Sequence, residues 1–414
     1  MSSTNGSRPR FMFSAAEVSG DAQAARLAGE LRRLDPDVRL WGMGGAHMAA
    51  AGVDVEIDIT DTSTFGLIDL FNSFPRHLRT LRRLRRMLAD RRPDALILVD
   101  APGFNFAVAT VARRLGVRTI YYIPPQTWLW NPASAARRMR NKVDLVVAIF
   151  EREAMLYRQA GANVVYHGHP LVDLSRLSVA PREARLRHGI PEGLPCIGLF
   201  PGSRRQEIAR LLPAMARAVD RIRANVGPVR VVLGVASAQL RDVVHSVLPA
   251  DTPDLHVFES SAHDALACCD VSLAASGTIL LEAVALDAPV VMTYKLDALT
   301  YLYGKYLLKV PRKIPYYSMP NIVANARVVP ELVLEAATPE RLAAEALGLL
   351  TDAGRREEMR RGFRVIRSRL GTPGVVSRVA QDILGFLAPS PQAVGAPERT
   401  GALFERARRA EPHS

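Results

Sequence analysis

Three short turns rich in small residues carry the clearest chemical signal in this sequence. They read AAEVSGD (residues 15–21), FPGSRRQE (200–207) and ASGT (275–278). Each follows a short apolar run and precedes a helical pattern. A strand, a small-residue turn and a helix start present free backbone N–H groups and the positive end of the helix dipole to an anion, commonly a phosphate. Recurrence in both halves predicts two nucleotide-binding-type domains that face one another.

The elements that must position these turns alternate between strand and helix. Continuous apolar runs predict parallel strands covered on both faces, and the alternation with helices predicts doubly wound sheets. The expected strands are 11–14, 39–43, 95–99, 118–123, 145–150 and 164–167, then 196–200, 229–234, 255–258, 271–274 and 290–294. The predicted fold class is therefore α/β: two doubly wound, Rossmann-like domains facing across a cleft, with C-terminal helices that cross back to the first domain.

A chain of 414 residues is long enough for two such domains. We expect a first domain over residues 1–175 and a second over 176–355. Crossover helices over 356–387 follow, and then a disordered tail over 388–414, which is rich in Pro, Ser, Gly and charge.

Composition narrows the class of partner. The net charge of +13 predicts an anionic partner, such as nucleic acid, phospholipid or a phosphorylated substrate. Cys196, Cys268 and Cys269 lack the spacing of a zinc site or a disulfide framework, so a reducing cytoplasm is the simplest compartment. No signal peptide and no membrane-spanning run is expected.

A series of collinear motifs resembles the lipid-A-disaccharide synthase family. Any one of them is weak, whereas the whole series, over roughly residues 10–385, is specific. The matching segments are AEVSGD (16–21), GMGG (42–45), VDAPGFN (99–105), YIPPQTWLW (122–130), GHPL (168–171), LFPGSR (199–204) with Glu207, ASGT (275–278) with Glu282, and SMPN (318–321).

Departures from the family pattern lie in the first half. Ala16 and Val18 replace a glycine and a small residue, Gly103 replaces a carboxylate, and Pro124-Pro125-Gln126 replaces Ser-Pro-Ser. These positions line the acceptor side in the family, whereas the donor-side motifs are nearly intact. The resemblance therefore predicts sugar-nucleotide binding more firmly than it predicts the acceptor.

The resemblance implies an inverting transfer of 2,3-diacylglucosamine from UDP to 2,3-diacylglucosamine 1-phosphate, giving lipid A disaccharide 1-phosphate. Such a transfer needs a base for the acceptor hydroxyl, and Asp100, at a strand end, resembles the family's proposed base. The alternative is an aspartate that caps the next helix. The other residues expected on the acceptor side are Glu17, Ser19, Gly20, Asp21 and Asn105.

The departing UDP needs groups that stabilise its charge. The turns at 202–204 and 277–278 can do so without a metal ion, so no metal and no cofactor is expected. The sole D-x-D, Asp35-Pro36-Asp37, is interpreted as a solvated turn. The expected UDP-sugar-binding residues are Gly202, Ser203, Arg204, Glu207, Ser276, Gly277, Thr278, Glu282 and Asn321. For Gly202, Glu282 and Asn321, an ordinary turn or surface role is the alternative.

Residues 65–92 combine an apolar face with clustered arginines. This pattern is typical of a helix on an anionic leaflet, although an amphipathic helix packed on its own sheet is the alternative. Residues 301–313 repeat the mixture. With acylated substrates, these segments predict a cytoplasmic enzyme held peripherally on the anionic inner face of the inner membrane.

Other functions stay open. A related UDP-sugar transferase or epimerase with a different acceptor would share the fold and the donor motifs, and a noncatalytic UDP-sugar-binding relative would explain the altered acceptor motifs. No nucleic-acid module is visible, and neither glycine turn reads GxGxxG, which disfavours an NAD-dependent oxidoreductase. His167 and His169 are expected to have a structural or interdomain role.

Overall fold

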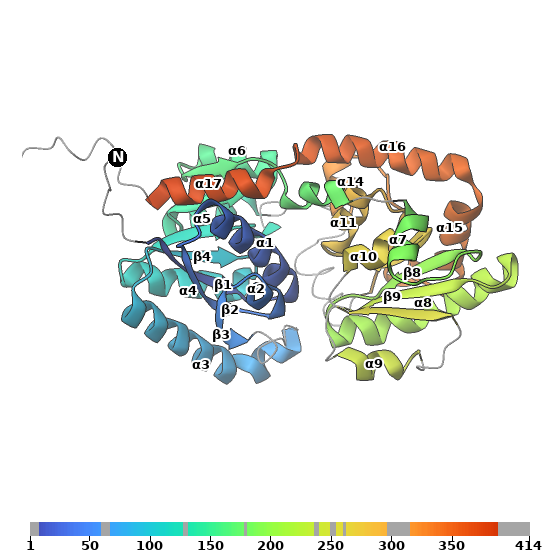
Figure 1. Ribbon diagram of the computed structural model, residues 1–414, viewed down its shortest axis with the longest axis horizontal. Coiled ribbons are helices and arrows are strands. Elements are labelled where there is room, and N and C mark those ends of the chain that lie inside the picture. Colours follow the sequence, from blue (N-terminus) through green and yellow to red (C-terminus); the bar gives the residue numbers. More distant parts are fainter. Residues whose placement is uncertain are drawn as a thin grey trace, which may run out of the picture.

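In the computed structural model of the protein, two parallel sheets lie side by side, each covered by helices (Figure 1). The structure describes residues 8–58, 67–126, 131–177, 180–235, 240–248, 254–259, 262–295 and 315–387. The expected tail at 388–414, the aromatic residues 127–130 and the segment 301–313 lie outside the described residues.

The first sheet has seven parallel strands in the order β3-β2-β1-β4-β5-β6-β7. Its strands are β1 (Arg10–Ala15), β2 (Arg39–Gly44), β3 (Asp54–Asp58), β4 (Ala95–Val99), β5 (Arg118–Tyr122), β6 (Leu145–Ala148) and β7 (Val164–Tyr166). Its helices are α1 (Val18–Leu34), α2 (Ala46–Ala50), α3 (Leu67–Arg91), α4 (Pro102–Arg114), α5 (Pro132–Lys142) and α6 (Glu151–Gln159).

The second sheet has six parallel strands in the order β10-β9-β8-β11-β12-β13. They are β8 (Cys196–Phe200), β9 (Arg230–Val235), β10 (Leu255–Glu259), β11 (Val271–Ala275), β12 (Val290–Tyr294) and β13 (Glu331–Val333). The helices that follow β7 in the chain are η3 (Pro170–Leu177), α7 (Pro181–Arg187), α8 (Arg205–Val226), α9 (Arg241–His245), α10 (Ala262–Ala267), α11 (Ile279–Leu286), α14 (Met319–Ala324), η6 (Leu334–Ala336), α15 (Pro339–Thr351), α16 (Ala353–Leu370) and α17 (Val375–Leu387).

The central strands explain why the sequence reads as it does. Every residue of β4, β8 and β11 is buried, because helices cover both faces of each sheet, and these strands are continuous apolar runs. The predicted α/β class with two Rossmann-like sheets is confirmed. The edge strands β3 and β13 were not predicted, because each is short, contains acidic residues and is only partly buried.

The last two helices divide between the two halves of the molecule (Figure 1). Helix α16 packs on α11, α14 and α15, whereas α17 packs on α1, β7 and η3. The chain therefore crosses back between Leu370 and Val375. Of the last two helices, only α17 packs on the first domain, whereas the sequence suggested that the crossing began near residue 356.

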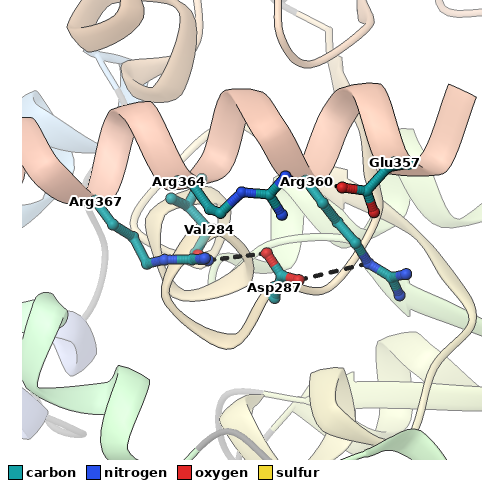
Figure 2. A network of polar contacts seen from close by, with 6 residues as sticks. All are labelled: Val284, Asp287, Glu357, Arg360, Arg364 and Arg367. Atoms are coloured by element: carbon teal, nitrogen blue, oxygen red, sulfur yellow. Dashed lines mark hydrogen bonds and ion pairs between the residues drawn. The ribbon is translucent and has the colours of Figure 1, made fainter.

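A polar network fixes α16 to the C-terminal end of α11 (Figure 2). Asp287 ends α11 in the left-handed conformation, with φ of 61°. Its carboxylate accepts from Nη1 of Arg367 at 2.9 Å and pairs with Nε of Arg360 at 3.5 Å. Arg367 also donates to the carbonyl of Val284 at 2.7 Å. The network therefore fixes α16 to the end of α11 that lies opposite the ASGT turn.

Contacts at the crossing itself fix α17 to the first half. Asp173 of η3 accepts hydrogen bonds from the first N–H groups of α17, a side-chain cap on its N-terminus. His167 Nε2 lies 2.6 Å from Asp382 Oδ2 of α17, and His169 is buried against Phe150. Both histidines thus have the structural role that the sequence predicted.

Helix α3 has a basic outer face and a buried inner face. Leu84 and Leu88 are fully buried, and α3 packs on α4. Arg82, Arg85 and Arg86 are exposed. The second half of the predicted membrane segment is therefore an amphipathic helix packed on its own domain. No helix in the described part of the chain is long and apolar enough to cross a membrane.

Candidate active site

Each sheet has a switch point at which two adjacent central strands lead to helices on opposite faces, and ligands of doubly wound folds bind there. In the first sheet these strands are β1 and β4, and in the second they are β8 and β11. The predicted site segments follow these four strands: Glu17 after β1, Asp100 after β4, residues 202–204 after β8 and residues 276–278 after β11.

Asp100 stands in a strained turn. It and Ala101 have φ values of 49° and 44°, in the left-handed region that residues with a side chain rarely adopt. Pro102 then begins α4 at a position where proline is favoured. Two successive residues of this kind cost on the order of 1–2 kcal/mol each, and such strain gathers at functional sites.

Three side chains hold this turn in place. The amide of Asn105 donates to the backbone carbonyls of Val99 and Asp100 at 3.0 and 2.8 Å, and it accepts from the Ser14 hydroxyl at 2.8 Å. The Tyr121 hydroxyl donates to the Asp100 carbonyl at 2.7 Å. Asn105, predicted on the acceptor side, is fully buried and therefore positions Asp100 instead of reaching a substrate.

The surroundings of Asp100 suit a general base. The pKa of its carboxyl is raised to about 6, first by burial and then by the negative charge of Glu17, and the Ala101 N–H and Arg204 partly oppose this rise. A base with a pKa just below neutrality is ionised at pH 7 and still takes a proton readily. The Gly103 departure removes one carboxylate from the family pattern, but Glu17 supplies a neighbouring negative charge.

Arg204 connects the two switch points. Its Nη2 lies 3.5 Å from Oε2 of Glu17. This ion pair joins the turn after β8 to the turn after β1 across the two domains. Nη1 of the same guanidinium lies 3.6 Å from Oε1 of Glu207. The tertiary structure thus gathers Glu17, Asp100 and Arg204 into one charged cluster between the domains.

The turn after β8 is shaped by Gly202 and Glu207. Gly202 has φ of 114°, and a Cβ there would stand 2.4 Å from Oε2 of Glu207. That oxygen accepts from the Ser203 N–H at 3.2 Å. Glu207 therefore folds back onto its own helix start and positions Ser203 and Arg204, a more structural role than the sequence predicted.

The turn after β11 leads into an exposed N-terminal end of helix α11. Ser276 is half-buried, and Gly277 and Thr278 are exposed at the N-terminal end of α11. Thr278 has no side-chain cap bond. Glu282 lies one turn into the helix, and burial raises the pKa of its carboxyl, opposed first by Arg26 and then by His263 and His47. Arg26 and His47 come from the first domain, so Glu282 also faces the cleft.

Two predicted ligand contacts have structural roles instead. The Asp21 carboxylate is buried and accepts from the N–H groups of Gly45, His47 and Met48, which caps α2. Asn321 is fully buried, and both amide hydrogens and both lone pairs are used within residues 321–331. The Asn321 amide therefore has no hydrogen-bonding capacity left for a ligand, and the buried Asp21 carboxylate is engaged in three internal hydrogen bonds.

Four further residues lie around the Asp100 turn, of which the sequence predicted Ser19 and Gly20 but not Ser14 and Tyr121. Ser19 and Gly20 lie in the first turn of α1, with Gly20 close to the Val99 carbonyl. Ser14 and Tyr121 were not predicted as site residues, because only the sheet register places them beside Asp100.

Within the described residues, no group of three or more His, Cys, Asp or Glu side chains could hold a metal ion. Asp35 and Asp37 form a surface turn, with the Asp37 N–H donating to the Asp35 carboxylate.

Two facing parallel α/β domains, each with a switch point at its carboxyl edge, make a two-domain Rossmann-like fold. The structure resembles UDP-GlcNAc 2-epimerase from Neisseria meningitidis bound to UDP-GlcNAc, with a TM-score of 0.62 at 13% identity over 92% of this chain and 99% of that one. It also resembles the calicheamicin glycosyltransferase, with a TM-score of 0.55 at 18% identity over 93% and 100% of the two chains.

Sequence comparison gives the particular family. The model of the lipid-A-disaccharide synthetase family matches residues 11–372. The lipid-A-disaccharide synthase of Geobacter sulfurreducens is 36% identical over 93% of this chain and 99% of its own length. That of Solibacter usitatus is 37% identical over 91% and 98%. The chain belongs to the lipid-A-disaccharide synthase family, and the resemblance seen in its motifs is confirmed.

Proposed function

We propose that this protein is a glycosyltransferase that condenses UDP-2,3-diacylglucosamine with 2,3-diacylglucosamine 1-phosphate, giving lipid A disaccharide 1-phosphate and UDP. Family membership supports the reaction. The observation that carries the assignment of the site is the cluster of Glu17, Asp100 and Arg204 between the two switch points.

The proposed chemistry divides between the domains. The Asp100 carboxylate takes the proton of the acceptor 6-hydroxyl as that oxygen attacks the anomeric carbon, with inversion. The bond from that carbon to the UDP oxygen breaks, and UDP leaves as an anion. The N–H groups at the starts of α8 and α11, together with the Arg204 guanidinium, stabilise its charge without a metal ion. We further propose that the domains span 1–175 and 176–355, followed by the crossover helices.

The direct test is an assay with both acylated substrates, in which thin-layer chromatography and mass spectrometry follow disaccharide 1-phosphate and UDP. The wild type is expected to form both products in equal amounts, and Asp100→Asn to form neither at a comparable rate. UDP binding without any product from this acceptor would contradict the proposed acceptor and favour a relative with another substrate. Unchanged turnover in the presence of a chelator is expected, and its loss would contradict metal independence.

We also propose that the basic face of α3 attaches the enzyme to the anionic inner face of the inner membrane. Three of its exposed arginines are Arg82, Arg85 and Arg86. Each basic residue near such a surface contributes about 1 kcal/mol. Flotation with anionic vesicles is expected to weaken with salt and in the triple Arg→Ser variant, with Arg113→Ser of α4 as the matched control. Equal flotation with neutral vesicles would contradict the proposal.

A further inference from the structure

The ion pair between the two domains is formed by two equivalent residues. Glu17 is the N-cap residue of α1, after β1, and Arg204 is the N-cap residue of α8, after β8. Neither side chain makes a cap hydrogen bond on its own helix. Instead, Nη2 of Arg204 lies 3.5 Å from Oε2 of Glu17. The same turn of the two domains thus supplies the cation and the anion of one contact.

The contacts of the Arg204 guanidinium are long. Charge-assisted hydrogen bonds of this kind are about 2.7–2.9 Å. The Arg204 guanidinium, in contrast, lies 3.5 Å from Glu17 and 3.6 Å from Glu207. The next residue, Arg205, forms a tight pair, since both of its Nη atoms donate to the Asp242 carboxylate at 2.7 Å. The Arg204 side chain is also 48% exposed, so an anion from solvent can take it over without breaking a strong contact.

The same ion pair sets the charge around Asp100. Besides burial, the groups that act on the pKa of its carboxyl are the Glu17 carboxylate, the Ala101 N–H and the Arg204 guanidinium. The Tyr121 hydroxyl donates to the backbone carbonyl of Asp100. While Arg204 is paired with Glu17, it partly cancels the negative charge beside Asp100. An anion that binds Arg204 leaves that charge uncancelled.

We infer that, in the free enzyme, the Glu17 carboxylate occupies the place on Arg204 that a diphosphate oxygen takes when the sugar-nucleotide donor binds. A diphosphate offers adjacent anionic oxygens to both Nη atoms, which suits the planar guanidinium better than two separate, distant carboxylates do. Glu17 is then a positioning residue, and its released charge strengthens the Asp100 base only when a donor is present. The inference rests on the proposed function, since it needs a UDP-sugar donor and Asp100 as the base.

Calorimetry of UDP binding to the full-length protein at about pH 7.5 tests this exchange with a double-mutant cycle. Glu17→Gln is expected to raise UDP affinity about 2–5-fold, the range of an exposed ion pair, because the competing carboxylate is gone. In the Arg204→Ala background the gain is expected to be smaller, since only repulsion between Glu17 and the ligand remains to be relieved. Glu30→Gln of α1 is the matched control and is expected to leave UDP affinity unchanged.

The outcomes separate the inference from the proposed function. Unchanged or lower UDP affinity in Glu17→Gln would overturn the inference, because Glu17 would then not compete with the ligand for Arg204. An equal gain with and without Arg204 would also overturn it, since the gain would come from repulsion alone. Both results leave the donor site in place, whereas a wild type that does not bind UDP would overturn the proposed function as well. Thermal melts of each variant show whether it is folded.

Proton uptake on UDP binding is a readout that a merely structural role would not move. Calorimetry at about pH 6.5 in buffers of different ionisation enthalpy measures it. Because the released Glu17 charge favours protonated Asp100, the wild type is expected to take up more protons than Asp100→Asn. Glu17→Gln is expected to lie between the two. Uptake in Glu17→Gln equal to that of the wild type would contradict the release of Glu17.

Discussion

At its switch point the first domain presents two carboxylates, Glu17 and Asp100, whereas the second presents backbone N–H groups and a guanidinium. Both points are built in the same way, from two adjacent parallel strands that lead into helices. In the proposed mechanism, the equivalent position of the two domains therefore performs opposite tasks: one side accepts a proton, and the other stabilises a departing anion.

The two switch points also differ in the backbone conformation of their turns. The first domain uses two residues with side chains, Asp100 and Ala101, in the left-handed region and holds them with Asn105 and Tyr121. The second domain uses Gly202, which adopts its positive φ without that strain. A general base needs a side chain at a fixed position, and holding that side chain there can require a strained backbone. An anion site built from backbone N–H groups needs no side chain at the turn, so a glycine can form it without strain.

The largest effect is expected from removing the base. Asp100→Asn keeps the shape of the turn but cannot accept the hydroxyl proton, so kcat is expected to fall by about 10²–10⁴-fold. UDP affinity, measured by calorimetry, is expected to stay close to that of the wild type, since it depends on the other switch point. If Asp100→Asn retained most of its turnover, the base would have to be another carboxylate, and Glu17 is the nearest candidate.

The same substitution is expected to stabilise the fold. A folded-state pKa of about 6 lies above the value of an exposed aspartate, so the stability that Asp100 contributes is present below about pH 4 and lost as the pH rises through 6. At pH 7 this cost is about 3 kcal/mol as an upper estimate. Denaturant titration of Asp100→Asn is expected to show greater stability at pH 7 and little gain at pH 4. Equal stability at pH 7 would show that the carboxyl is not buried as the structure indicates.

Arg204→Ala tests the opposite side of the comparison. Losing a charge-assisted contact to the diphosphate is expected to weaken UDP binding by about 1.5–3 kcal/mol. The variant also loses a cation that lowers the pKa of Asp100, so the acid limb of its rate profile is expected at higher pH. Calorimetry and a pH–rate profile separate the two effects. UDP affinity equal to that of the wild type would remove Arg204 from the donor site.

Glu17→Gln is expected to shift the pH dependence with a smaller loss of rate. Wild-type kcat/KM should rise through pH 6 as Asp100 ionises, and the neighbouring Glu17 charge raises that pKa. Removing the charge moves the acid limb toward lower pH. A pH–rate profile measures the shift, with Glu30→Gln of α1 as the control. An acid limb at the same pH as in the wild type would contradict the effect of the Glu17 charge on Asp100.

The smallest effect is expected from relieving strain. Ala101→Gly removes the left-handed cost of a residue with a side chain but adds chain entropy to the unfolded state, so its net change in stability is expected to be under about 1 kcal/mol. Thermal unfolding gives this value. A loss of several kcal/mol would mean that the Ala101 side chain packs more tightly than its turn position requires.

The sequence by itself determined the fold class and the family. Buried parallel strands are continuous apolar runs, so β4, β8 and β12 were predicted with their observed bounds. The turns at 202–204 and 276–278 were predicted because their glycines and helix starts are local features. Short, half-exposed edge strands such as β3 lack that local signal and were missed.

Only the tertiary structure decided which polar residues face the cleft. Asn105, Asp21 and Asn321 stand in motifs beside the site, yet their side chains are used in internal hydrogen bonds. Conversely, Tyr121 was not singled out in a motif, and the strand register places its hydroxyl on the Asp100 carbonyl. Hydrogen bonds and charges act over a few ångströms in space, and a sequence of 414 residues does not by itself fix which distant residues come that close.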